Sequence, residues 1–156
     1  MPEFEGQLRP VGRVALIVSR YNEVVTEKLL LGAKACCARA GIAEENVCTV
    51  RVPGAFELGA ASLAAARSGR YAAIVALGAV IRGETPHFEF VAEETSRQLG
   101  NVVLATGVPV GFGLLTTEDL AQATARAGGA AGNKGEEACE AAIRAADVIR
   151  QLREAR

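Results

Sequence analysis

The only histidine of this 156-residue chain, His87, lies in the stretch GAVIRGETPHFEF at residues 78–90. A strand followed by a glycine turn and a proline typically leads into a helix that begins at about the proline. Backbone N–H groups near Glu84 and Thr85 would then be free at the helix N-terminus, where anions bind readily. The helix dipole there disfavours a protonated imidazole, which suits a neutral base or proton shuttle. A purely structural histidine is the alternative, but the position at a strand end favours the catalytic interpretation.

Two cations follow later in the chain. Arg126 lies in the last turn of a predicted helix that ends at Gly128-Gly129, and Lys134 lies in the sequence GNKG. A cation at a helix C-terminus often only complements the dipole. A guanidinium can equally bind a phosphate through two parallel hydrogen bonds. The residues alone leave both interpretations open for Arg126 and for Lys134.

Two of the few aromatic residues, Tyr21 and Phe56, follow predicted strands. Aromatic side chains at strand ends indicate a flat ligand, although both could belong to the core. Glu57 could accept hydrogen bonds from a polar heterocycle or could simply be a solvated glutamate at a helix start. Phe112 lies inside a predicted strand, where burial is the default expectation.

The four cysteines, Cys36, Cys37, Cys48 and Cys139, form no CxxC pair. An adjacent pair grips one metal ion poorly, and one histidine adds little, so this pattern argues against a zinc site. We expect buried, reduced thiols that behave as small apolar residues. A nucleophilic cysteine is the alternative, but it would lack a histidine nearby in sequence.

The composition excludes several classes of protein. The formal net charge is −1 and aromatic residues make up 4% of the chain, which argues against nucleic acid or an anionic membrane as a partner. The apolar run at residues 71–80 is about half the length of a bilayer span. The N-terminus shows no basic segment followed by an apolar one, so we expect a soluble cytoplasmic protein.

Apolar strands alternate with helical patterns along the chain. The sequence predicts strands at residues 13–19, 46–52, 72–77 and 108–115, and helices at 23–40, within 53–69, from 87 to about 104, from the N-cap Thr116 to 128, and from about 133 onward. This order predicts a single α/β domain over residues 1–156, a three-layer αβα sandwich with a four-stranded parallel sheet. Ligands bind beyond the carboxyl ends of such strands. Residues 1–10 read as a short arm that is either disordered or paired with a sheet edge, that of a neighbouring subunit included.

Four segments in this order, PGAFEL, GAVIRGETPHFEFVA, PVGFGLLTTEDL and RAGGAAGNKG, resemble the lumazine synthase family of riboflavin biosynthesis. The resemblance runs from about Val14 to the C-terminus. It implies a flavodoxin-like fold and a reaction without cofactor or metal. That reaction condenses 5-amino-6-(D-ribitylamino)uracil with 3,4-dihydroxy-2-butanone 4-phosphate into 6,7-dimethyl-8-ribityllumazine, and it releases phosphate and water.

The resemblance also implies roles for individual residues. His87 matches the proton-transfer histidine, and Glu84, Thr85 and Arg126 match the phosphate site. The pyrimidine and ribityl side would comprise Tyr21, Ala55, Phe56, Glu57, Ala79, Val80 and Ile81, with Phe112 from a neighbouring subunit, and Asn22 and Lys134 are further candidates. Three positions depart from the family pattern: Tyr21 replaces the commoner Phe, Gly59 the usual proline, and Gly111 a β-branched residue. We expect the two glycines to loosen the local backbone.

The family resemblance implies an oligomer as well. Pentamers with active sites between subunits are typical, and the short RAGGAAGNKG link resembles members in which twelve pentamers form a 60-subunit shell that can enclose riboflavin synthase. Two alternatives remain: a non-catalytic flavin- or lumazine-binding or shell protein on the same fold, and an electron-transfer protein carrying FMN. The second should have a Ser/Thr/Gly-rich phosphate loop after its first strand, where this chain has SRYNEVV.

Overall fold

The predicted parallel sheet is confirmed. In the computed structural model, which describes residues 1–155, the four main strands are β1 (Val14–Ser19), β2 (Val47–Val52), β3 (Ala73–Ile81) and β4 (Val110–Thr117). They are parallel and lie in the order β2-β1-β3-β4. β1 and β3 are therefore central, which explains why they are apolar almost throughout and nearly completely buried.

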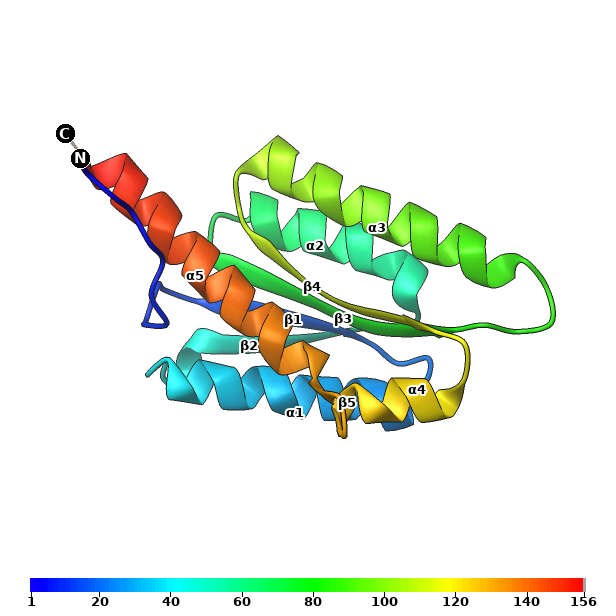
Figure 1. The fold of residues 1–156 in the computed structure, drawn as a ribbon. Helices are drawn as coiled ribbons and strands as arrows, with labels where there is room; N and C mark the ends of the chain where they lie inside the picture. The colour runs from blue at the N-terminus through cyan, green and yellow to red at the C-terminus, as the bar shows by residue number, and fades with distance from the viewer. Residues whose placement is uncertain (156) are drawn as a thin grey trace.

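Helices cover both faces of this sheet, as the three-layer prediction requires (Figure 1). One face packs against α1 (Glu23–Arg39), α4 (Leu120–Ala125) and α5 (Lys134–Glu154), and the other against α2 (Leu58–Arg67) and α3 (His87–Thr106). Two short 3₁₀ turns, η1 (Glu44–Asn46) and η2 (Ala55–Glu57), flank β2. No helix within residues 1–155 is long and apolar enough to cross a membrane.

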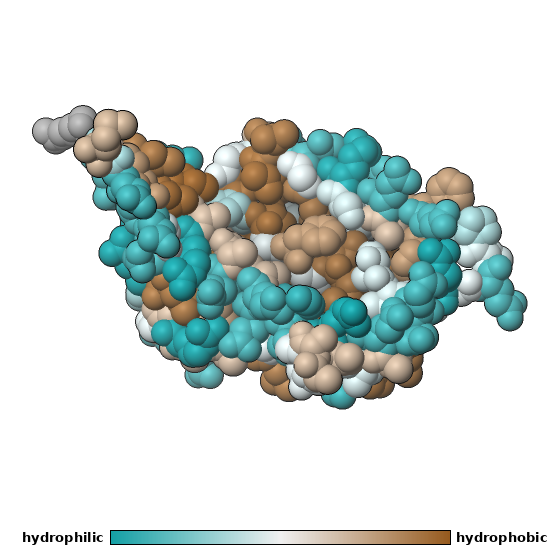
Figure 2. All heavy atoms as spheres, in the orientation of Figure 1, coloured by the Kyte–Doolittle hydropathy of each residue, from teal (hydrophilic) through white to brown (hydrophobic). Residues whose placement is uncertain are grey.

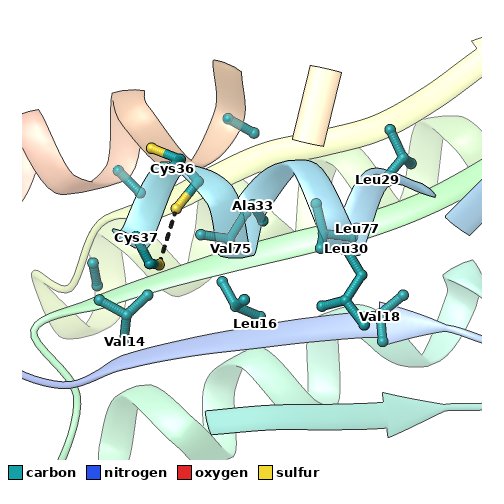
Figure 3. Packing of buried hydrophobic residues seen from close by; sticks show 14 of the residues in the cluster. Val14, Leu16, Val18, Leu29, Leu30, Ala33, Cys36, Cys37, Val75 and Leu77 are labelled. Atoms are coloured by element: carbon teal, nitrogen blue, oxygen red, sulfur yellow. Dashed lines mark hydrogen bonds between the residues drawn. The ribbon is translucent and has the colours of Figure 1, made fainter. Parts of the chain in front are cut away.

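Successive side chains of the central strands face opposite sides of the sheet and so divide the core into two clusters. Val14, Leu16 and Val18 of β1 point to the α1 face and pack beneath Leu29 and Leu30 (Figure 3). The intervening β1 residues Ala15 and Ile17 belong to the cluster beneath α2 and α3. Because successive side chains of a strand point to opposite faces, one apolar run supplies both cores.

β3 continues four residues further than the sequence predicted, from Leu77 to Ile81. The extra residues pair with the end of β4, and Gly78 lies opposite Leu114. Gly78 was expected to mark the strand end, but it lies inside the strand. A Cβ there would come within 3.0 Å of Leu58 and 3.1 Å of Leu114, so close packing explains the glycine.

The predicted N-cap of α4 was wrong. Thr116 belongs to β4, and Asp119 caps the helix by accepting a hydrogen bond of 2.8 Å from the Gln122 N–H. The helix also ends earlier than expected, at Ala125, and leads into a small hairpin of β5 (Ala127–Gly129) and β6 (Gly132–Asn133). Strands of two and three residues are too short to show an alternating pattern in sequence.

The N-terminal arm lies along α5 of the same chain, where Figure 1 shows the first residues beside the last helix. The buried carboxylate of Asp147 accepts hydrogen bonds from the Gln7 N–H (2.9 Å) and Arg9 Nε (2.7 Å). Arg144 donates to the Gly6 carbonyl at 3.1 Å, and Gln151 donates to the Glu5 carbonyl at 2.8 Å. The arm is therefore neither disordered nor part of its own chain's sheet.

The two glycines that depart from the family pattern lie at close approaches of elements, contrary to our expectation that they loosen the backbone. A Cβ on Gly111 would lie 2.9 Å from the carbonyl carbon of Ala138 and 3.2 Å from Ala142, both in α5. A Cβ on Gly59 would lie 2.8 Å from the Cβ of Gln98 in α3. Glycine therefore lets α5 approach β4 and α2 approach α3 more closely than a larger residue would allow.

β4 forms one edge of the sheet, and apolar surface gathers over it. Figure 2 shows this surface in the hollow between α3 and α5, with hydrophilic atoms around it. Phe112 of β4 is 53% exposed, so the expectation that it is buried within its own chain was wrong. An exposed edge strand with apolar side chains is a surface that pairs readily with another chain.

Candidate active site

A cavity of about 680 Å³ opens at the carboxyl end of the sheet, where ligands bind in this class of fold. Its wall combines residues from the ends of β1, β2 and β3 with the first turn of α3. The lining residues are Tyr21, Asn22, Gly54, Ala55, Phe56, Ala79, Val80, Ile81, Gly83, Thr85, His87, Phe88, Phe90 and Val91. Nine of the fourteen predicted site residues are among them: Tyr21, Asn22, Ala55, Phe56, Ala79, Val80, Ile81, Thr85 and His87.

Backbone hydrogen bonds hold the segment after β1 in place. The Arg20 and Tyr21 N–H groups each donate at 2.9 Å, to the carbonyls of Val52 and Pro53, so the β1 and β2 ends continue to pair beyond the strands. The Tyr21 side chain is 74% exposed and stands free in the cavity mouth. An aromatic ring held by a rigid backbone is suited to stacking on a flat ligand.

Asn22 connects this segment to β3. It is the one non-glycine residue with positive φ in the described chain, at 63°, and its carbonyl accepts the first hydrogen bonds of α1. Its Nδ2 donates to the Ala79 carbonyl at 2.8 Å. Asparagine adopts the left-handed conformation more easily than most residues, and strained backbone of this kind clusters at functional sites.

The wall after β2 is held by side-chain contacts to backbone. Glu57 Oε1 accepts a hydrogen bond of 2.9 Å from the Gly54 N–H, which closes the turn that carries Ala55 and Phe56. Thr95 of α3 donates to the Ala55 carbonyl at 3.4 Å. The Phe56 ring is left 51% exposed toward the cavity. The Glu57 carboxylate therefore supports the wall from behind and is not part of its surface.

Arg82 positions the turn that connects β3 to α3. Its backbone N–H donates to the Thr117 carbonyl at 2.9 Å, and its guanidinium donates to Glu118 at 2.8 Å and Glu89 at 3.3 Å. The guanidinium also lies over the Phe88 ring, 4.7 Å from the centroid. Hydrogen bonds to Glu89 and Glu118 raise the pKa of Arg82. Its charge is thus engaged by two carboxylates beside the cavity.

His87, the one histidine of the chain, is among the residues that line the cavity. It is the first residue of α3, and its side chain is exposed. The backbone N–H of His87 donates to Thr85 Oγ1 at 3.4 Å. The lining set contains no carboxylate and no lysine or arginine. Within the lining residues, an anion could therefore be bound only by uncharged donors, such as backbone N–H groups and the Thr85 hydroxyl, or by His87.

Five predicted site residues lie outside the lining set: Glu57, Glu84, Phe112, Arg126 and Lys134. Glu84 is exposed in the loop just before α3. Arg126 follows the last residue of α4 and donates to the Gln122 carbonyl at 3.0 Å, and Lys134 pairs with Glu137 at 3.3 Å. Arg126, Lys134 and Phe112 therefore do not line the cavity of their own chain.

Sequence reasoning missed Phe88, Phe90 and Val91, which belong to the cavity wall. A signal was available for two of them. Phe90 and Val91 follow His87 by three and four positions, the spacing that places residues on one helix face. Phe88 gives no such signal, because its placement depends on Arg82 stacking on its ring.

Comparison with known proteins identifies the family of this chain. The sequence profile of the 6,7-dimethyl-8-ribityllumazine synthase family matches residues 12–150. A protein named 6,7-dimethyl-8-ribityllumazine synthase from Nitratidesulfovibrio vulgaris (strain DSM 19637 / Miyazaki F) is 49% identical over 149 residues, 95% of this chain and 96% of the relative. One of the same name from Chlorobium chlorochromatii (strain CaD3) is 47% identical over 151 residues, 96% of this chain and 97% of the relative. The chain therefore belongs to the 6,7-dimethyl-8-ribityllumazine synthase family.

Proposed function

We propose that this protein catalyses the condensation of 5-amino-6-(D-ribitylamino)uracil with 3,4-dihydroxy-2-butanone 4-phosphate to 6,7-dimethyl-8-ribityllumazine, the penultimate step of riboflavin biosynthesis. The observation that carries the proposal is the cavity at the strand ends. It joins exposed aromatic side chains, a turn whose backbone N–H groups can bind an anion, and the one histidine of the chain in a single wall. Near-full-length identity to proteins named for this activity supports it.

The roles of the wall residues follow from their chemistry. Tyr21 and Phe56 would hold the pyrimidine ring, with the backbone of Ala79, Val80 and Ile81 along its edge. Gly83 and Thr85 would bind the phosphate through N–H groups at the start of α3. Orienting two substrates in one cavity supplies much of the rate enhancement in a reaction of this kind.

His87 would move the protons. Schiff-base formation moves protons from the amine to the ketone oxygen, which leaves as water. Phosphate elimination removes a proton from carbon as the C–O bond to phosphate breaks, and ring closure moves protons from the second amine to the oxygen that leaves as a second water. A neutral imidazole can accept and return them in turn. Because binding and orientation remain without it, loss of His87 should slow turnover and not abolish it.

A second copy of the chain would complete the phosphate site. The lining set offers no cation for a dianionic phosphate, and Arg82 is engaged by two carboxylates. Arg126 and Phe112 are held on the surface away from their own cavity, and Phe112 stands on the apolar β4 edge. We propose that they enter the cavity of an adjacent subunit, with Glu84 and Lys134 at its rim.

This arrangement supports a ring in which each site lies between two subunits, and we propose the pentamer as that ring. The short hairpin of β5 and β6 leaves the RAGGAAGNKG link without extra residues, which favours twelve pentamers in a 60-subunit shell that can enclose riboflavin synthase. Light scattering of the purified protein distinguishes a pentamer from a 60-mer by a twelvefold difference in mass.

The test of the activity is to mix the protein with both substrates and follow the lumazine absorbance. We expect a rate well above that of the uncatalysed reaction, with one phosphate released per lumazine. Tight binding of the pyrimidine substrate or riboflavin without any rate above background would favour the non-catalytic binding protein. Copurified yellow FMN would favour the electron-transfer protein.

A further inference from the structure

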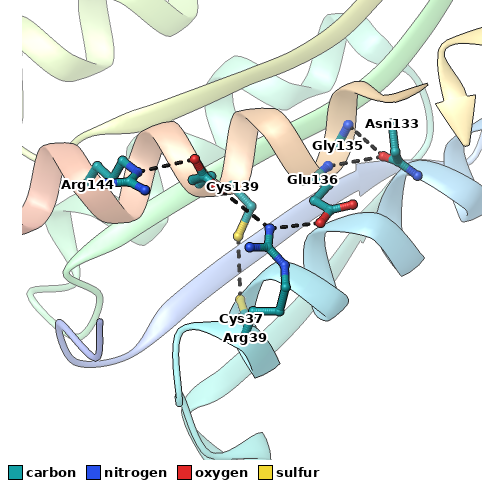
Figure 4. A network of polar contacts seen from close by, with 8 residues as sticks. Cys37, Arg39, Asn133, Gly135, Glu136, Cys139 and Arg144 are labelled. Carbon is teal, nitrogen blue, oxygen red and sulfur yellow. Dashed lines mark hydrogen bonds and ion pairs between the residues drawn. The ribbon is translucent and has the colours of Figure 1, made fainter. Parts of the chain in front are cut away.

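Three of the four cysteines meet where α1 crosses α5, on the side of the sheet away from α2 and α3. Cys36 and Cys37 of α1 and Cys139 of α5 are each at most 1% exposed. The Sγ atoms of Cys37 and Cys139 lie 3.5 Å apart, within hydrogen-bond distance for sulfur (Figure 4). The fourth cysteine, Cys48 of β2, is partly exposed.

The contact between Cys37 and Cys139 joins residues 102 positions apart. A disulfide needs an S–S distance of about 2.0 Å, so the two sulfurs would have to approach by roughly 1.5 Å. The approach requires rotation about the Cα–Cβ bonds and a small shift of the helices. Cys36 also interacts with Cys139, but only the Cys37 sulfur lies within hydrogen-bond distance.

Cys37 lies behind the wall of a second cavity, and because its side chain is only 1% exposed, a small solute reaches its sulfur only when the wall opens locally. This cavity, of about 280 Å³, lies between α1, η1 and β2, and Lys34 and Ala38 of the same helix also line it. A water molecule occupies about 30 Å³ in the liquid, so hydrogen peroxide fits this cavity easily. The wall also carries one charge of each sign, Lys34 and Glu44.

The two thiols differ in how readily each ionises. The hydrogen bond from Cys139 lowers the pKa of Cys37, against the opposing effect of burial. The same contacts, with Cys36 and Cys37, raise the pKa of Cys139. Cys37 also lines the cavity and Cys139 does not, so we assign Cys37 as the first nucleophile and Cys139 as the thiol of the second step.

We propose that Cys37 and Cys139 form a peroxide-oxidisable dithiol whose disulfide joins α1 to α5. In the first step the Cys37 thiolate attacks one oxygen of hydrogen peroxide, the O–O bond breaks, and the departing hydroxide takes a proton to become water. In the second step Cys139 attacks the Cys37 sulfenic acid, the S–S bond forms, and a second water leaves with the Cys139 proton. Overall, two thiols and one peroxide give one disulfide and two waters.

The crosslink would act on stability and not on the chemistry of the cavity at the strand ends. It closes a loop of about a hundred residues, and such loops restrict the unfolded chain strongly. A reducing compartment keeps the pair as thiols, so the bond would form under peroxide stress and be removed by a dithiol reductant. The proposal does not depend on the catalytic function.

Trypsin cleavage places the four cysteines on three peptides. Cys36 and Cys37 share the peptide Ala35–Arg39, Cys48 lies in Ala40–Arg51, and Cys139 lies in Gly135–Arg144. The assembled full-length protein is treated with hydrogen peroxide, its remaining thiols are alkylated under denaturing conditions, and the unreduced digest is analysed by mass spectrometry. We expect Ala35–Arg39 joined to Gly135–Arg144, two of four thiols lost, and Cys48 still alkylated.

Cysteine variants show whether Cys36 or Cys37 forms the crosslink to Cys139. Cys36→Ala and the matched control Cys48→Ala should retain the crosslink, and Cys37→Ala should abolish it. In the wild type, oxidation should shift the guanidinium midpoint upward, and dithiothreitol should reverse the shift. Oxidation of Cys37 to a sulfinic acid without a crosslink would overturn the proposal. Loss of the crosslink in Cys36→Ala would overturn it as well. If a variant fails to fold, fragmentation of the crosslinked wild-type peptide between Cys36 and Cys37 identifies the bonded residue, and a bond to Cys36 would overturn the proposal.

Discussion

Asn22 offers a test of how the fold holds the cavity wall, because its two contributions can be removed separately. Its backbone has a φ of 63°, and its Nδ2 donates to the Ala79 carbonyl at 2.8 Å. Glycine at position 22 accepts this φ but loses the hydrogen bond. Alanine loses the hydrogen bond and also lacks the short polar side chain that lets asparagine adopt the left-handed region more easily than most residues.

The expected magnitudes follow from these contacts. Loss of one hydrogen bond to the Ala79 carbonyl should lower the free energy of unfolding by about 1 kcal/mol in Asn22→Gly. Left-handed strain adds about 1 kcal/mol, so Asn22→Ala should lose about 2 kcal/mol. Both variants leave the β1 segment less firmly tied to β3, so the KM for the pyrimidine substrate should rise in both.

Guanidinium unfolding followed by circular dichroism measures the two free energies, and steady-state kinetics measures the KM. All variants are compared at one protein concentration, because association of subunits would make the measured stability depend on concentration. Equal losses for alanine and glycine would refute the role of the left-handed backbone. A glycine variant as stable as the wild type would refute the role of the hydrogen bond to Ala79.

Three further predictions concern single side chains. His87→Gln should lower kcat by about 10- to 100-fold with little change in the KM of either substrate, because general acid–base catalysis is lost while orientation remains. Steady-state kinetics measures both quantities, and an unchanged kcat would contradict this role. Arg82→Ala should raise the KM for the phosphate substrate several-fold, because the turn before α3 loses its contacts to Glu118 and Glu89. Arg82→Lys should have a KM between those of the wild type and Arg82→Ala, and equal kinetics in both variants would argue against positioning by this side chain. Asp147→Asn should destabilise the protein by about 2 kcal/mol at neutral pH. Arg9 and its other partners hold the pKa of Asp147 well below its usual range, so its contribution is complete above about pH 4 and is lost as the pH falls further; a wild-type-to-variant difference in urea unfolding that persists unchanged at pH 3 and below would contradict it.

The sheet could be predicted because strands buried on both faces are recognisable as apolar runs. β1 and β3 differ from every other part of the chain in this respect, and the glycines after α1 and α2 indicate where those helices end. The exact strand ends could not be predicted. Residues 78–81 continue β3 only because β4 pairs with them, and this pairing is a long-range contact that no local pattern reports.

The same limit applies to the arm and to the glycines at close contacts. The position of the arm depends on Asp147, which is 138 residues from Arg9 in sequence and has no local signal of its own. Gly111 was expected to loosen the backbone because the contact that explains it lies far along the chain, at the backbone of Ala138 in α5.

The site was predictable where it lies at strand ends. Tyr21, Phe56 and His87 follow β1, β2 and β3, and parallel strands bring their carboxyl ends to one edge. Phe112 and Arg126 were named from the family motif, and this chain alone does not bring them to the cavity. Whether they act across a subunit boundary depends on the arrangement of copies, which a single sequence does not specify physically.

The central claim is that both substrates react in the cavity at the strand ends, with the phosphate held by the turn before α3. Gly83 lies in that turn, and a Cβ there would meet nothing within 4 Å, so a longer side chain fits. Gly83→Glu adds a negative charge near the phosphate, which costs on the order of 1–2 kcal/mol, whereas Gly83→Gln has the same shape without the charge. The decisive measurement is lumazine formation together with phosphate release in the wild type and in both variants. We predict one phosphate per lumazine in the wild type, a KM for the phosphate substrate about tenfold higher in Gly83→Glu, and a much smaller change in Gly83→Gln. No lumazine from the wild type, or the same KM in all three proteins, would contradict the claim.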